Sequence, residues 1–174
     1  MLYIGIDPGV GGAIAAVNSK GRLYRIWDTP VTEVKKGKKK QRQYLIASMA
    51  ELLRSIPQDR IRVVGLELVH AMPKNGSVAN FALGRGSGLW EGVVCGVGLP
   101  LEHVTPQAWK KELLGQGAGG DKSASIVRAQ QVYPQAVKYL TRKKDDGRAE
   151  ALLIAEYFRR HFSRMNGGGC IMAR

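Results

Sequence analysis

The chain has 174 residues, of which 27 are Lys or Arg and 14 are Asp or Glu, so its formal net charge is +13. This length suits one domain that buries about 70% of its unfolded surface, and no segment approaches the roughly 20 apolar residues that a membrane span needs. The basic balance predicts a polyanionic partner, with nucleic acid favoured over a membrane surface. The two cysteines show no zinc-site spacing and fit a reduced, cytoplasmic protein, in the host cytoplasm if a phage encodes it.

The first part of the chain predicts an antiparallel meander followed by a helix. Three apolar runs separated by glycine-containing turns are typical of strands and lie at 2–7, 12–18 and 22–30. The basic segment "VKKGKKKQR" at 34–42 is interpreted as a loop or as the tip of a ribbon. Apolar residues at helical spacing then predict a helix at 43–56, which Pro57 ends.

The rest of the chain alternates strands and helices. In order, the pattern predicts a strand at 61–69, a helix at 77–95, a strand at 100–105, a helix from Pro106, a helix after the loop at 115–125 and a helix at 146–163. This order is typical of an α/β domain with a mixed sheet. We expect one domain over 1–164 and a glycine-rich tail at 165–174.

Glycine recurs at every fourth position along the predicted helix at 77–95. The four residues are Gly84, Gly88, Gly92 and Gly96. A glycine face allows close approach of another backbone, and two partners for it are open. Tight packing on a sheet is favoured over a dimer interface.

Two carboxylates stand where apolar strands end. Asp7 follows the first predicted strand and Glu67 lies near the end of the strand at 61–69. Burying a carboxylate costs several kcal/mol unless it is paired or binds a metal. If the two strands are neighbours, the side chains converge and repel, so we expect a cation between them.

The segment "DDGRAE" supplies further carboxylates. Asp146 and Glu150 are four residues apart and share one face of a helix, whereas Asp145 points elsewhere unless the helix begins later. Clusters of three or four carboxylates suit Mg²⁺ or Mn²⁺, and two such ions roughly 4 Å apart can drive phosphodiester hydrolysis. Separate structural roles for each acid are the alternative, and spacing alone does not decide between them.

Three acidic motifs resemble the RuvC family of Holliday-junction resolvases, in the RNase H-like superfamily. They are "IGIDPG" (4–9), "VVGLELVHAMPKNG" (63–76) and "DDGRAEALLIAEY" (145–157). "VTPQAWKKEL" and "DKSASIVRAQQVYP" are similar to further segments of the family, so the resemblance covers nearly the whole chain in order. It is closer to the bacteriophage and organellar branch than to the bacterial enzyme.

The resemblance implies a five-stranded mixed sheet flanked by helices, in a homodimer that uses two Mg²⁺ ions per site, replaceable by Mn²⁺, to nick four-way or branched DNA symmetrically. The implied catalytic and metal-binding residues are Asp7, Glu67, Glu150 and either Asp146, which helix geometry favours, or Asp145. Asp7 would bridge both metals, Glu67 would hold one, and the C-terminal pair would hold the other beside the attacking water. Glu150 stands where bacterial members have Asp.

Basic residues outside the acidic motifs are candidates for DNA binding. The dense cluster predicts a flexible arm that grips phosphates, with a solubilising loop as the alternative, and comprises Lys35, Lys36, Lys38, Lys39, Lys40 and Arg42. Lys122 opens a helix after a glycine-rich loop, where backbone N–H groups also bind phosphate. His70, Met72 and Lys74 lie where the family contacts the junction centre, although packing beneath the loop explains His70 and Met72 as well.

Three other functions are alternatives to a structure-selective endonuclease that leaves 5′-phosphate and 3′-hydroxyl ends. An RNA–DNA hybrid nuclease of the RNase H type shares the fold and needs no dimer. A phosphotransferase of the actin and sugar-kinase type also begins "IGID", but it needs two such domains. A non-catalytic protein that binds branched DNA is disfavoured because all the expected acids are present. No membrane partner is expected.

Overall fold

The computed structural model describes residues 1–37, 39–71, 76–115 and 122–167, with the backbone alone described for Lys36, Lys39, Lys122 and 166–167. The strands are β1 (Leu2–Ile6), β2 (Ala13–Asn18), β3 (Leu23–Asp28), β4 (Val31–Lys36), β5 (Lys39–Tyr44), β6 (Ile61–Glu67) and β7 (Leu101–Val104). The α-helices are α1 (Ile46–Arg54), α2 (Ser77–Gly96), α3 (Pro106–Leu114), α4 (Lys122–Val132) and α5 (Asp146–Gly167). Three short 3₁₀ helices are η1 (Gln58–Arg60), η2 (Pro134–Tyr139) and η3 (Lys143–Asp145).

Five strands form one mixed sheet, as predicted, and their order is β3-β2-β1-β6-β7. The meander β1-β2-β3 is antiparallel, whereas β6 lies parallel to β1 and β7 lies parallel to β6. Every residue of β1 is buried, because helices cover both faces of the sheet and leave no side of this central strand for solvent. The register pairs Ile6 with Leu66, so β1 and β6 end side by side.

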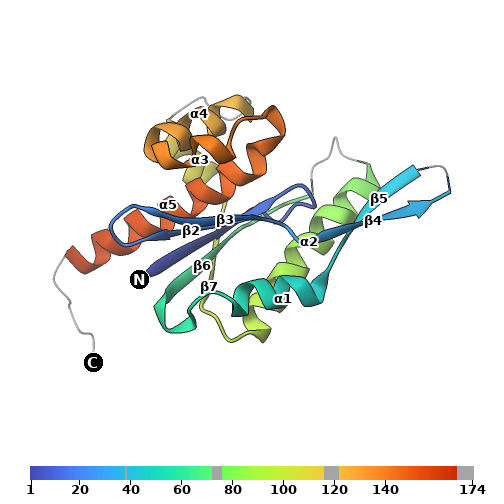
Figure 1. Cartoon of the computed structure of the whole chain (residues 1–174), viewed down its shortest axis with the longest axis horizontal. Coiled ribbons are helices and arrows are strands. Elements are labelled where there is room, and N and C mark those ends of the chain that lie inside the picture. The colour runs from blue at the N-terminus through green and yellow to red at the C-terminus, as the bar shows by residue number, and fades with distance from the viewer. Residues whose placement is uncertain (38, 72–75, 116–121, 168–174) are drawn as a thin grey trace.

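Helices cover the two faces of the sheet and enclose two hydrophobic cores (Figure 1). One core lies under α3, α4 and α5, with Trp109 and Leu152 fully buried in it. The other lies under α1 and α2 and contains Met49 and Trp90. The contact between α5 and β1 is close enough to require glycine, since a Cβ at Gly5 would overlap the backbone of α5.

The basic segment forms a ribbon, β4–β5, that projects from the central sheet (Figure 1). Its register runs from the pair Val31–Tyr44 at the base to the pair Lys36–Lys39 near the tip. The ribbon interpretation is therefore correct, and the helix predicted at 43–56 starts too early, because 43 and 44 complete β5. The hydroxyl of Tyr44 donates a hydrogen bond of 2.9 Å to the carbonyl of Pro8, which fastens the base of the ribbon to the loop after β1.

The glycine face of α2 does not pack on the sheet, so that prediction is wrong. A Cβ at Gly84, Gly88, Gly92 or Gly96 would meet nothing within 4 Å. The buried face of α2 is formed instead by larger side chains and includes Trp90, Val93 and Val94. The glycines thus lie on an open helix face in the described part of the chain.

The last helix is longer than predicted, since α5 continues to Gly167. The domain boundary at 164 stays a prediction, and residues 168–174 of the predicted tail lie outside the described residues. Among the described helices, none is both long and apolar enough to cross a membrane.

Candidate active site

Asp7 and Glu67 occupy the same edge of the central sheet. Glu67 is the last residue of β6 and Asp7 directly follows β1, the parallel neighbour of β6. Glu67 is buried, with 7% of its surface exposed. The strand order therefore brings together two acids that are 60 residues apart in the chain, as the sequence predicted.

The first turn of α5 packs directly on Asp7. A Cβ at Gly147 would lie 2.8 Å from Asp7 Oδ2 and 2.7 Å from the carbonyl oxygen of Gly11. Only glycine fits at this position without a shift of α5. The close approach brings Asp146 and Glu150, on either side of Gly147 in the same helix, towards the acids of the sheet.

The pKa of Asp7 reports this concentration of negative charge. The pKa of Asp7 is raised from 3.8 to about 7, most by burial, next by the charges of Glu150 and Glu67, and least by that of Asp146. The backbone N–H of Gly9 donates to Asp7 Oδ1 at 3.2 Å, which favours the ionised form but does not offset the other effects. Asp7 thus lies within electrostatic reach of three other carboxylates.

Glu67 is oriented by an indole on α3. Trp109 Nε1 donates to Glu67 Oε1 at 2.9 Å, and both side chains are buried. Burial raises the pKa of Glu67, and the negative charge of Glu150 raises it further. The hydrogen bond from Trp109 and the charge of Lys110 lower it in part. The sequence pattern does not predict this hydrogen bond.

Glu150 is held by two polar neighbours. Lys110 Nζ lies 3.0 Å from Glu150 Oε1, and Ser125 Oγ donates to the same oxygen at 3.3 Å. Lys110 also lies over the ring of Trp109, 5.0 Å from its centroid. Lys110 was not placed at the site from the sequence. The signal was present, however, because α3 begins directly after β7, the neighbour of the strand that carries Glu67.

Asp145 and Asp146 differ in their surroundings. Asp145 is buried and paired with Arg142, whose Nη2 lies 2.7 Å from Asp145 Oδ1 and whose backbone N–H donates to Oδ2 at 2.8 Å. These bonds hold the pKa of Asp145 below its usual value, and Arg148 adds a weaker contribution. Asp146 is the neighbour whose charge acts on Asp7. Asp145 is therefore engaged by Arg142, and the choice of Asp146 as the fourth carboxylate stays a prediction.

The donor set fits Mg²⁺ in its chemistry. The four acids supply only hard oxygen ligands, and a divalent cation would relieve the repulsion that raises the pKa of Asp7. In the described part of the chain, however, no three His, Cys, Asp or Glu side chains form a ready group that could hold a metal. Glu67 and Glu150 are turned to Trp109 and Lys110 instead.

The predicted DNA-binding residues fall on the ribbon and around the active site. Lys35, Lys40 and Arg42 are exposed on the ribbon, and Lys40 pairs with Glu33 at 3.2 Å. His70 is exposed just beyond β6. Lys36 and Lys39 lie in the ribbon strands and Lys122 begins α4, without described side chains. Lys38, Met72 and Lys74 lie outside the described residues.

Comparison with known proteins points to one group of nucleases. No protein-family model matches the chain. The chloroplastic Holliday junction resolvase MOC1 of Chlamydomonas reinhardtii is 30% identical over 151 residues, which cover 76% of this chain and 17% of that protein. The chain therefore spans less than a fifth of the length of this curated relative.

Solved structures share the fold over almost the whole chain. RuvC of T. thermophilus in complex with a Holliday junction substrate superimposes with a TM-score of 0.62 at 18% identity, covering 96% of each chain. A further Thermus thermophilus RuvC structure gives a TM-score of 0.54 at 19% identity, covering 92% of this chain and 97% of the other. These likenesses confirm the predicted α/β fold, a five-stranded mixed sheet flanked by helices, which this chain shares with RuvC.

Proposed function

Because this chain resembles the RuvC family in its acidic motifs and shares the RuvC fold, we propose that it is a Holliday-junction resolvase. The proposed reaction is a pair of symmetric nicks in a four-way or branched DNA, with 5′-phosphate and 3′-hydroxyl ends. One observation carries the proposal: Asp7 and Glu67 lie at the ends of neighbouring parallel strands, and the start of α5, which carries Asp146 and Glu150, packs on Asp7.

In the proposed mechanism, Asp7, Glu67, Asp146 and Glu150 hold Mg²⁺ at the ends of β1 and β6. Two such ions would activate water for attack on phosphorus and stabilise the leaving oxygen, and Mn²⁺ would substitute. Gly11 is exposed and a Cβ there would meet nothing within 4 Å, so the backbone of the loop beside Asp7 is open to a phosphate at this residue. The indole of Trp109 fixes the carboxylate of Glu67 while the cation binds.

Positive charge around the site would guide DNA to the carboxylates. The ribbon β4–β5 carries Lys35, Lys40 and Arg42 on exposed positions and projects from the body of the molecule (Figure 1). Its phosphate contacts would make affinity fall steeply with salt concentration. His70 is placed beyond Glu67, where it would reach a base or phosphate of the junction.

Symmetric nicking requires two sites, and α2 offers a surface for a homodimer. Its glycine face is open, and Val78 and Phe81 on the same helix are 77% and 74% exposed. Exposed apolar side chains that gather on one surface mark protein–protein contacts, and Val78 and Phe81 lie one turn apart on α2. We therefore propose a homodimer through α2. The cytoplasmic location stays a prediction, since the name of the curated relative refers to the chloroplast.

The test is cleavage of a labelled four-way junction with Mg²⁺, beside a linear duplex and an RNA–DNA hybrid. We expect paired nicks in opposite strands of the junction only, and their loss in Asp7→Asn and Asp146→Asn. Asp145→Asn is the matched control and should retain cleavage. Cutting of the hybrid alone would assign the chain to the RNase H type. Tight junction binding without cleavage would instead make it a DNA-binding protein.

A further inference from the structure

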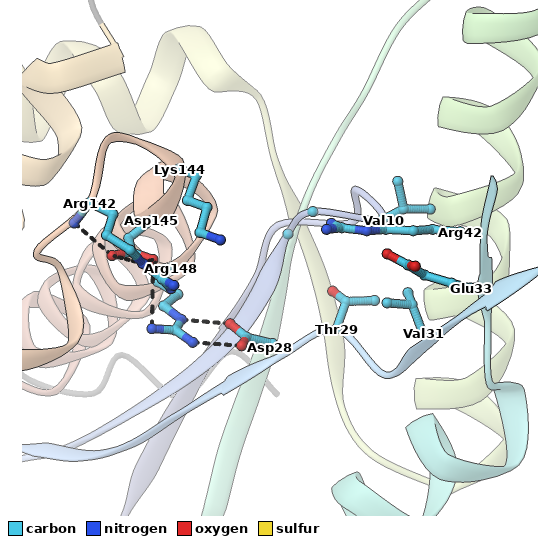
Figure 2. A pocket seen from close by; sticks show the side chains of 12 residues that line it. Val10, Asp28, Thr29, Val31, Glu33, Arg42, Arg142, Lys144, Asp145 and Arg148 are labelled. Atoms are coloured by element: carbon cyan, nitrogen blue, oxygen red, sulfur yellow. Dashed lines mark hydrogen bonds and ion pairs between the residues drawn. The ribbon is translucent and has the colours of Figure 1, made fainter. Parts of the chain in front are cut away.

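A cavity of about 290 Å³ lies beside the candidate active site, between the base of the ribbon and the start of α5 (Figure 2). The loop residues Val10, Gly11 and Gly12 line it. The same loop contacts the active site, because a Cβ at Gly12 would overlap Asp7. The cavity and the carboxylates therefore lie against one short loop.

Two of the four cations that line the cavity are already paired. Arg142 binds Asp145, and Arg148 Nη2 donates to Asp28 Oδ2 at 2.6 Å. Arg148 Nη1 also donates to a backbone carbonyl at 3.1 Å. Both arginines thus form part of the wall, and Arg148 holds β3 and η2 against α5.

The other two cations, Arg42 and Lys144, have no ion pair or hydrogen bond within the described residues. Arg42 comes from β5 and Lys144 from η3, and their charged ends point towards each other from opposite walls (Figure 2). Glu33 also lines the cavity, but its carboxylate pairs with Lys40. Two unpaired positive groups that face each other favour an anion between them.

A third polar group is available at the same place. Thr29 is only 4% exposed, and its hydroxyl has no hydrogen-bond partner among the described residues. Figure 2 shows the hydroxyl on the cavity side of the residue. A buried hydroxyl without a partner costs free energy, which a ligand oxygen in the cavity would recover.

We propose that this cavity holds a phosphate of the DNA strand that is cut, close to the phosphate that reacts at the carboxylates. Arg42 and Lys144 bind its oxygens from two sides, and Thr29 donates a hydrogen bond from the floor. The inference rests on the proposed function, since it places the DNA strand across the loop 10–12. It would fix the direction in which the strand leaves the active site.

The experiment scans the cut strand with single methylphosphonates, which replace one charged phosphate by a neutral one, at three positions on each side of the cleavage point. Binding of each junction is measured in EDTA for wild type, Arg42→Ala, Lys144→Ala and Lys143→Ala. Lys143→Ala removes the same charge one residue away, on an exposed side chain that does not line the cavity. Binding in EDTA does not depend on cleavage, so failure of the proposed function is detected separately by the nicking assay.

We expect one position at which the neutral linkage weakens wild-type binding about tenfold, as loss of a charged hydrogen bond would. In Arg42→Ala and Lys144→Ala the same linkage should change affinity less than about twofold, while Lys143→Ala should behave as wild type. The salt slope of each cavity variant should fall by about 1. Absence of any such coupled position in the cut strand, or equal coupling in Lys143→Ala, would overturn the proposal.

Thr29→Val distinguishes a ligand contact from a structural role. The substitution preserves shape and removes a buried hydroxyl that has no partner, so the free protein should keep or slightly raise its melting temperature. Junction binding should weaken about threefold, in line with the loss of one neutral hydrogen bond. Unchanged binding would remove Thr29 from the site.

Discussion

Asp7→Asn should make the metal-free protein more stable while it abolishes cleavage. The folded protein raises the pKa of Asp7 from 3.8 to about 7, mainly by burial and next by the charges of Glu150 and Glu67. A carboxyl whose folded pKa lies above its unfolded value destabilises the fold once it is ionised. Asn preserves the oxygen that accepts from Gly9 and removes the charge.

The magnitude follows from the shift. At pH 8, above both pKa values, ionised Asp7 lowers the free energy of unfolding by at most about 4 kcal/mol, since each pKa unit corresponds to about 1.4 kcal/mol. At pH 5 the folded carboxyl is protonated while the unfolded one is ionised, so the cost falls to about 2 kcal/mol. The advantage of Asp7→Asn over wild type should therefore grow as the pH rises from 5 to 8.

The assay is urea unfolding of both proteins in EDTA at pH 5 and pH 8, followed by circular dichroism. A stability gain at pH 8 that is about twice the gain at pH 5 is expected. Saturating Mg²⁺ should stabilise wild type and not the variant, because only the carboxylate binds the ion well. An Asp7→Asn protein that is less stable than wild type at pH 8, or a gain independent of pH, would refute the reasoning.

Three further substitutions test the supports of the site. Trp109→Phe removes the indole N–H that holds Glu67, so the Mg²⁺ concentration for half-maximal nicking should rise about tenfold or more, with folding checked by circular dichroism. Asp145→Asn breaks charged hydrogen bonds to Arg142, so the free energy of unfolding measured in urea should fall by about 1–3 kcal/mol at neutral pH. Because the pKa of Asp145 is lowered in the folded protein, this difference from wild type should vanish as the pH falls and the wild-type carboxyl takes up its proton. Gly5→Ala forces a Cβ into the backbone of α5, so it should lower the free energy of unfolding in urea by more than about 3 kcal/mol or prevent soluble expression.

The sheet could be predicted because its signals are local. The apolar runs are short, glycine-containing turns separate the first three, and helical spacing follows in alternation with strands. Asp7 and Glu67 were identifiable as exceptional for the same reason: each ends a run that is otherwise core, and the parallel pairing of β1 and β6 then places them together. Their role as metal ligands stays a prediction.

The contacts that hold the carboxylates in place could not be predicted, because they depend on how each helix is rotated about its own axis. Trp109 and Lys110 are consecutive residues of α3, yet one is buried and donates to Glu67 while the other pairs with Glu150. A helical pattern indicates which face is apolar, but not which acid that face meets. The choice between Asp145 and Asp146 had the same origin, since it depends on the residue at which α5 begins.

The glycine pattern of α2 shows why periodicity alone misassigns a face. Helical spacing establishes that the glycines share one side of the helix. The same spacing occurs whether that side is open or tightly packed, so it does not tell the two apart. The decisive information lies in the large residues of α2: Trp90 is fully buried, whereas Phe81 is mostly exposed. The large side chains of α2 therefore face the sheet, and its glycines face outward.

The proposed function gives a physical reason for the excess of basic residues in this chain. Carboxylates crowded at the ends of β1 and β6 would repel a DNA strand unless cations stand close to them, and Mg²⁺ alone neutralises only the centre of the site. Lys110 beside Glu150, and Arg42 facing Lys144 across the adjacent cavity, lie where a strand would run outward from that centre. In the proposed function, positive charge along that line would attract the phosphates that flank the reacting one and would let the acidic centre approach its target.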